Sequence, residues 1–350
     1  MNPTYNRRGI AVRPASGYNR RRNKMRLPAV AVVADIGGTK VLAAVVAADG
    51  TVLGRTTLPT HAEGGPQAVI DHTVQALRQA LEQAGRGSGE MAAIGIACAG
   101  LVDIERGVVV ASPNLPGWAR VPLRERIEAA LRVRTFLAND ANAAALGEHR
   151  FGAGRGANHL IFVTVSTGIG GGLVLGGKLY TGAWGTAGEV GHMVLEPGGP
   201  RCACGQQGCL EALASGTAMA REASQRLKAG EPSQLLALAG GRPEGVTAEL
   251  IGQAANAGDK LAGEVVERAA TYLGIGLGNL VNLLNPEVIV VGGGVSRLGE
   301  LLLAPARKAM QAHAFPHAVS GMKLVQASLG DMAGVMGMAS YVMEAVQASR

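Results

Sequence analysis

Cysteines and long apolar runs are scarce in this sequence. Only four cysteines occur in 350 residues, and three of them fall within eight positions, unlike the disulfide framework of a secreted protein. No apolar run approaches the roughly 18 residues of a membrane-spanning helix. We therefore expect a globular protein of the reducing cytoplasm that does not enter a membrane.

Aromatic and charged residues are also few. They make up 3% and 17% of the sequence, against 47% hydrophobic residues and 52 glycines. Abundant glycine predicts many tight turns and close backbone approaches. A chain of 350 residues is long for one hydrophobic core, so we expect two domains.

The net charge of +7 is unevenly distributed. Residues 1–26 contain eight basic and no acidic residues, whereas the rest contains 25 basic and 26 acidic residues. The main body therefore lacks the basic surface typical of nucleic-acid binding. Residues 1–26 have no hydrophobic periodicity, so we expect a disordered basic tail and a physiological start at Met25.

Two similar segments stand about 130 residues apart. The buried strand Val30–Ala34 precedes a turn at Asp35–Lys40, and the strand Leu160–Val165 precedes a glycine turn at Ser166–Gly172. Each turn leads into another strand, which predicts a duplicated α/β fold. Backbone N–H groups in such turns can bind phosphate oxygens, although an ordinary hairpin also uses glycine.

The first turn adds charged and polar side chains. Thr39 or Lys40 can donate a hydrogen bond to phosphate, but Asp35 would repel phosphate unless a cation lay between them. This arrangement predicts a magnesium ion.

Asp140 lies between a strand ending at Ala138 and an alanine-rich helix at Ala141–His149. It can serve as the helix N-cap. The carboxyl end of a strand is also where α/β proteins place catalytic groups. In the loop Ser112–Trp118, Asn114 is available to bind a polar ligand, or to cap its own turn.

A dense cluster of metal-ligand residues follows. Three cysteines within eight residues and a histidine ten residues upstream suit a tetrahedral zinc site, formed by His192, Cys202, Cys204 and Cys209. Glu189 and Glu211 flank the cluster, so folding around a metal would gather two carboxylates and an imidazole. The alternatives are a zinc-stapled loop with solvated acids, or a disulfide with a spare thiol.

These motifs together resemble the ROK family of bacterial sugar kinases and sugar-responsive repressors, and its glucokinases most. The resemblance extends from about Val30 to the end of the chain and rests on Asp35–Lys40, Asn139–Asp140, Ser166–Gly172, Glu189–His192, Cys202–Glu211 and Val291–Ser296. It implies an α/β fold of the actin-like ATPase (ribonuclease H-like) type, duplicated, with a central cleft between two domains. The expected division is 27–138 plus about 335–350 for the small domain, and 139–334 for the larger.

The resemblance also implies an activity, ATP-dependent phosphorylation of glucose at its 6-hydroxyl, and a homodimer or homotetramer. Asp140 is then the general base, and His192 and the three clustered cysteines bind structural zinc. The implied sugar contacts are Asn114, Asn139, Asp140, Glu189, His192 and Glu211. The implied contacts to ATP and magnesium are Asp35, Gly37, Gly38, Thr39, Lys40, Thr167, Gly168, Gly293 and Gly294.

Other functions stay open at this point. Another hexose, an N-acetylhexosamine or a polyphosphate donor is compatible with the same motifs, because the sequence does not describe the shape of a pocket. A ROK repressor requires a helix-turn-helix module ahead of the kinase-like body, and residues before Asp35 show no helical periodicity. Glycines 292–294 also fit plain helix–sheet packing.

Overall fold

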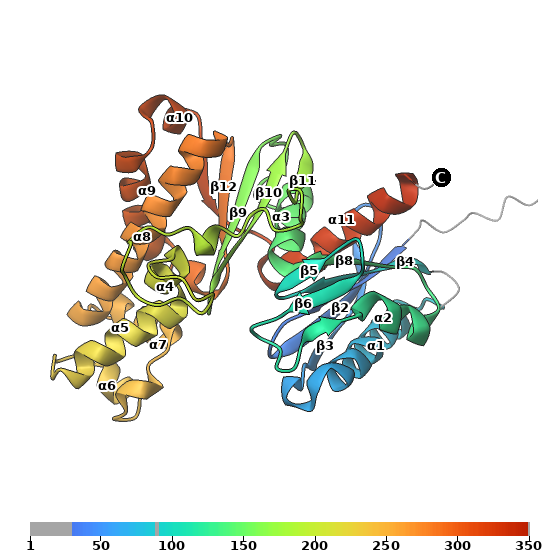
Figure 1. Ribbon diagram of the computed structural model, residues 1–350, viewed down its shortest axis with the longest axis horizontal. Coiled ribbons are helices and arrows are strands. Elements are labelled where there is room, and N and C mark those ends of the chain that lie inside the picture. The colour runs from blue at the N-terminus through green and yellow to red at the C-terminus, as the bar shows by residue number, and fades with distance from the viewer. Residues whose placement is uncertain (1–29, 88–90, 349–350) are drawn as a thin grey trace, which may run out of the picture.

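The computed structural model describes residues 30–87 and 91–348 (Figure 1). The expected basic tail and the expected start at Met25 lie outside these ranges. Within them the chain forms two five-stranded sheets, a three-stranded sheet and the helices that cover them. None of the described helices is both long enough and apolar enough to cross a membrane.

The first large sheet is built from β1 (Val30–Ile36), β2 (Lys40–Val46), β3 (Val52–Pro59), β4 (Met91–Cys98) and β8 (Thr135–Asn139). Its order is β3-β2-β1-β4-β8. β2 pairs antiparallel with β1 and β3, whereas β4 runs parallel to β1 and to β8. The inner strands are apolar runs because both faces of the sheet are covered.

The second large sheet is built from β9 (Leu160–Val165), β10 (Ile169–Leu175), β11 (Lys178–Tyr180), β12 (Val288–Gly292) and β13 (Lys323–Gln326). Its order, β11-β10-β9-β12-β13, and its strand directions repeat those of the first sheet. The predicted duplication is thus confirmed. The expected domain boundaries at 138/139 and near 335 stay a prediction.

Alternate residues of β1 face different layers. Val30, Val32 and Ile36 pack with α1 (Gly65–Gln83) and α2 (Leu123–Leu131). Ala31 and Val33 pack with α11 (Ala333–Ala348), the last helix of the chain. The C-terminal helix therefore returns to cover the first sheet (Figure 1).

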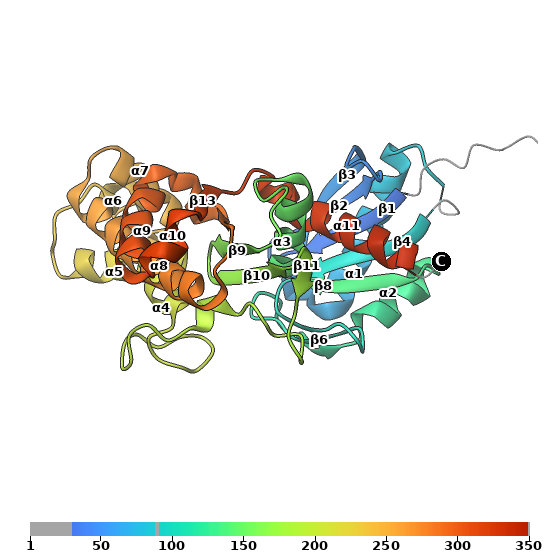
Figure 2. The same cartoon turned by 90° about the horizontal axis from the view of Figure 1, so that it is seen from above.

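The same alternation covers the second sheet. Leu160 and Phe162 of β9 face α3 (Asp140–Phe151), and Ile161 and Val163 face the large helical layer. That layer comprises α4 (Leu210–Ala214), α5 (Gly216–Lys228), α6 (Leu235–Leu238), α7 (Ala248–Asn256), α8 (Lys260–Leu284) and α9 (Glu300–His313), followed by α10 (Pro316–Ser320). Figure 2 shows this layer and the first sheet at opposite ends of the molecule.

Helices α3 and α11 pack closely together in the middle of the molecule (Figure 2). A side chain at Gly337 would collide with the carbonyl group of Ala143, and one at Gly147 would collide with that of Ala333. Glycine at these helix positions allows the two backbones to approach.

Some local expectations are wrong. Residues 170–172, expected in a turn, belong to β10, and only Ser166–Gly168 forms the turn. Leu101–Asp103 forms strand β5, which pairs with β6 (Val108–Ala111). The strands β7 (Ala119–Val121) and β13 were not expected, because short, half-exposed segments give little hydrophobic signal.

Candidate active site

Asp140 occupies the junction between strand β8 and helix α3. The N-cap residue is Asn139, whose side-chain oxygen accepts hydrogen bonds from the N–H groups of Ala141 at 2.9 Å and Asn142 at 3.1 Å. Its amide group donates to the carbonyl of Gly100 at 3.0 Å. The capping role considered for Asp140 is therefore wrong, and Asp140 is the first helical residue.

Asp35 and Asp140 lie close enough for their charges to interact. The pKa of Asp35 is raised from 3.8 to about 7, first by burial and then by the charge of Asp140, while Lys40 opposes the shift. Burial also raises the pKa of Asp140, against the N–H group of Ala141, which lowers it. Carboxyl groups withdrawn from water in this way favour a bound proton or a cation.

A charged network spans the two halves of the molecule. Lys40 Nζ lies 2.5 Å from Asp331 Oδ2, and Arg297 lies 3.4 Å from Asp331 Oδ1. Lys40 belongs to β2, Arg297 to the 3-10 helix Gly294–Leu298, and Asp331 precedes α11. The side chains of Lys40, Asp331 and Arg297 are 48%, 55% and 74% exposed, so a ligand can displace these pairs at little cost.

Thr60 stabilises the first glycine turn (residues 37–39) with two hydrogen bonds. The buried Thr60 hydroxyl donates to the carbonyl of Gly37 at 2.7 Å, and its N–H group donates to that of Thr39 at 3.0 Å. Asn114 lies beside this turn, because a Cβ atom placed on Gly38 would be 2.9 Å from the Asn114 carbonyl oxygen. The structure thus brings Asn114 to the glycines, and Thr60 is a supporting residue that sequence reasoning missed.

The second glycine turn (residues 166–168) lies next to the end of β12. Gly293 has φ +86°, and a Cβ atom there would meet Thr164 Oγ1 at 2.7 Å, so a side chain is excluded. The carbonyl of Thr167 accepts a hydrogen bond from the Thr217 hydroxyl at 2.8 Å. A Cβ atom on Gly294 would lie 3.8 Å from Ser166 Oγ, so the glycines after β12 lie beside the second glycine turn, and their role as nucleotide contacts stays a prediction. Thr217, at the start of α5, gave no signal in the sequence.

The predicted metal ligands converge. The ligand atoms of His192, Cys202, Cys204 and Cys209 all lie within 4.8 Å of one another. Cys202 Sγ lies 3.7 Å from His192 Nδ1, and Cys204 Sγ lies 3.7 Å from Cys209 Sγ. Tetrahedral zinc with bonds of about 2.3 Å to sulfur separates its ligands by about 3.8 Å. These distances fit a zinc ion and are too long for a disulfide.

Two glutamates connect this cluster to the rest of the site. Glu211 Oε2 accepts a hydrogen bond from the N–H group of Ile169 at 2.9 Å, and Glu211 Oε1 lies 3.6 Å from Cys202 Sγ. Glu211 therefore links the metal cluster to the second glycine turn. The pKa of Glu189 is raised, first by burial and then by the charges of Asp140 and Glu211, against the opposing charge of His192.

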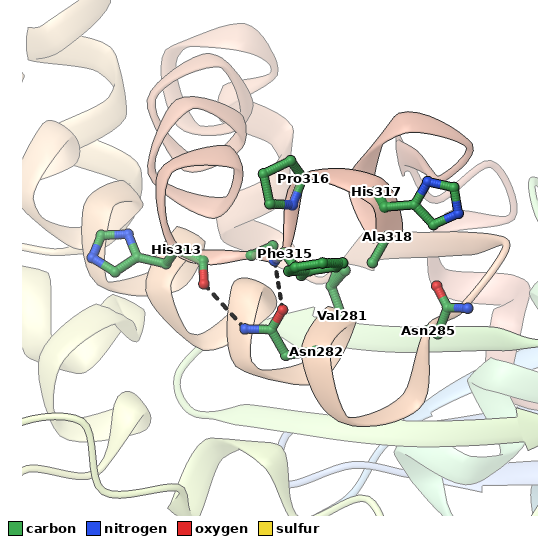
Figure 3. A pocket seen from close by; sticks show the side chains of 9 residues that line it. Val281, Asn282, Asn285, His313, Phe315, Pro316, His317 and Ala318 are labelled. Carbon is green, nitrogen blue, oxygen red and sulfur yellow. Dashed lines mark hydrogen bonds between the residues drawn. The ribbon is translucent and has the colours of Figure 1, made fainter.

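Two hollows lie away from these residues. One, of about 670 Å³, lies between the end of α8 and α10 and is lined by Asn282, His313 and Phe315 among others (Figure 3). The other, of about 810 Å³, lies at the C-terminal end of α3. Neither contains a residue predicted for the site, so the site is defined by the convergence of its side chains.

Known proteins resemble this chain over most of its length. The model of the ROK family matches residues 31–345. The glucokinase of Thermotoga maritima is 39% identical over 313 residues, which cover 89% of this chain and 96% of that protein. The xylose repressor of Caldicellulosiruptor bescii is 34% identical over 249 residues, 71% of this chain and 62% of the repressor.

A solved structure shows the same architecture. It is a ROK family glucokinase from Streptomyces griseus in complex with glucose and AMPPNP, 37% identical, with a TM-score of 0.78 over 90% of this chain and 99% of that one. The predicted actin-like ATPase fold is thereby confirmed. On the match over residues 31–345 and the shared architecture, the chain belongs to the ROK family.

Proposed function

We propose that this protein is an ATP-dependent glucokinase, which transfers the γ-phosphoryl group of ATP to the 6-hydroxyl of glucose. One observation carries the proposal. Asp140, with a raised pKa, starts helix α3 within electrostatic range of both Asp35 and Glu189. A base near both a group suited to cations and a group suited to hydroxyls fits phosphoryl transfer to a sugar.

Asp140 is the general base in this proposal. Its raised pKa brings it nearer to neutrality, where a carboxylate removes a hydroxyl proton more effectively. The cap made by Asn139 orients the first turn of α3 and with it the Asp140 side chain. Asn139 keeps one amide hydrogen for a sugar hydroxyl, because among the described residues its amide group donates only to the carbonyl of Gly100.

The two glycine turns hold the phosphates of ATP. Gly37, Gly38 and Thr39 offer one set of backbone N–H groups, and Thr167 and Gly168 offer the other, with Gly293 and Gly294 nearer the nucleoside. The ion pair between Lys40 and Asp331 is half-exposed, so Lys40 can leave Asp331 and bind a phosphate group of ATP. Asp35 is the residue to hold magnesium, which neutralises charge on the phosphates when bound.

The sugar hydroxyls are bound by the side chains of Glu189, His192, Glu211 and Asn114. His192 turns Nδ1 toward Cys202, so its Nε2 is left for a hydroxyl. Zinc held by His192, Cys202, Cys204 and Cys209 would lock that ring orientation. The metal is structural in this proposal, and the proton transfer takes place at Asp140.

The partner and the compartment complete the proposal. A second copy of this chain has a suitable surface at the hollow in Figure 3, where Phe315 is 67% exposed. We propose a homodimer or homotetramer in the cytoplasm, without nucleic-acid or membrane partners. The free thiols of the cluster are consistent with a reducing compartment.

A coupled ADP-release assay over a panel of sugars tests the activity. Wild type should turn over glucose with ATP in preference to mannose, fructose, N-acetylglucosamine and N-acetylmannosamine, and in preference to polyphosphate as donor. Another preferred sugar or donor would revise the substrate. Absence of turnover with every sugar, together with a specific mobility shift of operator DNA, would replace the kinase by a repressor.

A further inference from the structure

The hollow at the C-terminal end of α3 lies where the two halves of the molecule are joined. In the described chain, the backbone passes between the two large sheets twice, at residues 140–159 and at 327–332. Residues of the first connection, including His149 and Asn158, line this hollow, as does Leu329 of the second. We call it the crossover pocket.

The two connections are tied together directly beside the crossover pocket. The buried carboxylate of Glu148 accepts hydrogen bonds from the N–H group of Ala153 at 2.8 Å in the first connection. It also accepts from the N–H groups of Ser328 at 3.0 Å and Leu329 at 2.8 Å in the second. Charge-assisted bonds to backbone are strong, so the two connections are held together firmly.

The pocket is rich in groups that bind anions. Arg150 and Arg155 line it, are exposed, and form no ion pair within the described residues. His149 Nε2 donates a hydrogen bond to the carbonyl of Ala157 at 2.8 Å, which fixes the position of the ring. The one acidic lining residue, Asp49, accepts a hydrogen bond from the N–H group of Thr51 at 2.9 Å. Two arginines without an ion pair in the described chain therefore line a cavity of about 810 Å³.

We propose that the crossover pocket binds a small phosphate-bearing anion, either inorganic phosphate or a sugar phosphate. Guanidinium groups match phosphate oxygens with two parallel hydrogen bonds each, which favours phosphate over a single carboxylate. The volume exceeds that of a bare phosphate, so a sugar or similar organic group fits beside it. Asn158 supplies an amide for hydroxyls of that group.

The pocket is separate from the reaction site but mechanically connected to it. Arg150 and Asp140 lie on the same helix, ten residues and about 15 Å apart. Among the lining residues, Ala48, Asp49 and Gly50 belong to the first half of the molecule, whereas Gly177 belongs to the second. A bound anion therefore acts on the relative position of the two halves without touching either substrate.

Isothermal titration calorimetry tests the site with inorganic phosphate, glucose 6-phosphate and succinate as separate probes. The double variant Arg150→Gln, Arg155→Gln should bind phosphate at least about tenfold more weakly than wild type. A matched control, Arg78→Gln on the exposed face of α1, should bind like wild type. If the ligand is a sugar phosphate, glucose 6-phosphate should occupy two sites on wild type, one of them the product site, and one site on the double variant. If the ligand is inorganic phosphate alone, glucose 6-phosphate should occupy only the product site on both proteins.

The outcomes separate this inference from the kinase proposal. Failure of the kinase proposal alone would leave one glucose 6-phosphate site on wild type and none on the double variant. Equal affinity of wild type and the double variant for inorganic phosphate would overturn the crossover site, and tighter binding of succinate than of phosphate by wild type would overturn the phosphate assignment. If the double variant does not fold, the single variant Arg155→Gln takes its place in the phosphate titration. Arg155 lies on an exposed turn, so this substitution should not disturb folding. Without added anion, kcat and both KM values should stay within about twofold of wild type.

Discussion

The two halves of the molecule share one strand order but carry different side chains at equivalent places. In the first half, Asp35 stands one position before the end of β1, and Thr164 occupies the same place in β9. β3 and α1 are separated by five residues, whereas residues 181–215 separate β11 from α5 and contain the metal cluster. The duplication provides the frame, Asp35 belongs to the first sheet, and the segment with the metal cluster follows the second glycine turn; in the proposed function, magnesium binding and sugar binding are divided between them in the same way.

This division predicts different kinetic effects for matched substitutions in the two halves. Asp140→Asn should lower kcat by about 10²–10⁴-fold with little change in glucose KM, because it removes the base and keeps the size. Glu189→Gln should instead raise glucose KM more than it lowers kcat. Steady-state kinetics of the two variants test this difference between kcat and glucose KM. An Asp140→Asn enzyme with the wild-type kcat would contradict the assignment of the base.

The pH dependence of stability sharpens the contrast at Asp35. Its folded pKa of about 7 exceeds the unfolded value of 3.8, so ionisation at Asp35 costs stability as the pH rises from about 4 to 7. Asp35→Asn should therefore stabilise the metal-free protein by up to about 4 kcal/mol at pH 8, and by less at pH 5. Thermal denaturation at both values measures this.

The control for that experiment has the opposite sign. A hydrogen bond from the N–H group of Thr51 lowers the pKa of Asp49, so Asp49 favours folding above its unfolded pKa. Asp49→Asn should lose stability at pH 8 relative to pH 3. A pH-independent gain for Asp35→Asn would refute the unfavourable ionisation of Asp35.

Loss of the metal should affect only the recognition half. Cys204→Ser should weaken zinc binding and raise glucose KM about tenfold or more, while kcat changes by less than about threefold. Gln206→Ala, in the same exposed loop and without a ligand atom, should keep its zinc and its KM. Metal analysis with kinetics tests both variants. Unchanged glucose kinetics in verified zinc-free protein would remove His192 from sugar binding.

The smallest expected effect is on the free energy of unfolding, at two equivalent strand positions. Ala44 of β2 and Gly172 of β10 hold the same place relative to their turns. A Cβ atom at Gly172 would lie 2.6 Å from Ala145 Cβ, so Gly172→Ala should destabilise the protein by about 1–3 kcal/mol. Ala44→Gly should cost about 0.5–1 kcal/mol. Urea denaturation measures the free energy of unfolding of both variants. Equal losses would show that helix α3 shifts to make room for the alanine side chain at position 172.

The parts that could be predicted from sequence have local signals. Apolar runs indicated the buried strands, repeated glycine turns indicated the duplication, and the spacing of three cysteines and a histidine predicted the metal ligands. Glycines 170–172 misled the prediction, because glycine allows a turn and close packing equally. In β10 it is the packing of α3 that requires glycine at position 172.

Residues whose role depends on distant partners gave no such signal. Asp331 lies 291 positions from Lys40, and Glu148 reads in the sequence as an ordinary helix glutamate. Glu148 is nevertheless buried and joins both chain connections. Thr60 likewise supports the first glycine turn from more than twenty residues away.

The amino-acid sequence by itself determined the family, the duplicated sheets and the set of chemically capable side chains, because these follow from residue type and short-range spacing. Tertiary structure alone decided how those side chains are used. It decided that Asn139 rather than Asp140 caps α3, that burial beside Asp140 raises the pKa of Asp35, and that Arg150 and Arg155 line one cavity. Burial, charge proximity and cavity shape depend on chain segments brought together only by folding.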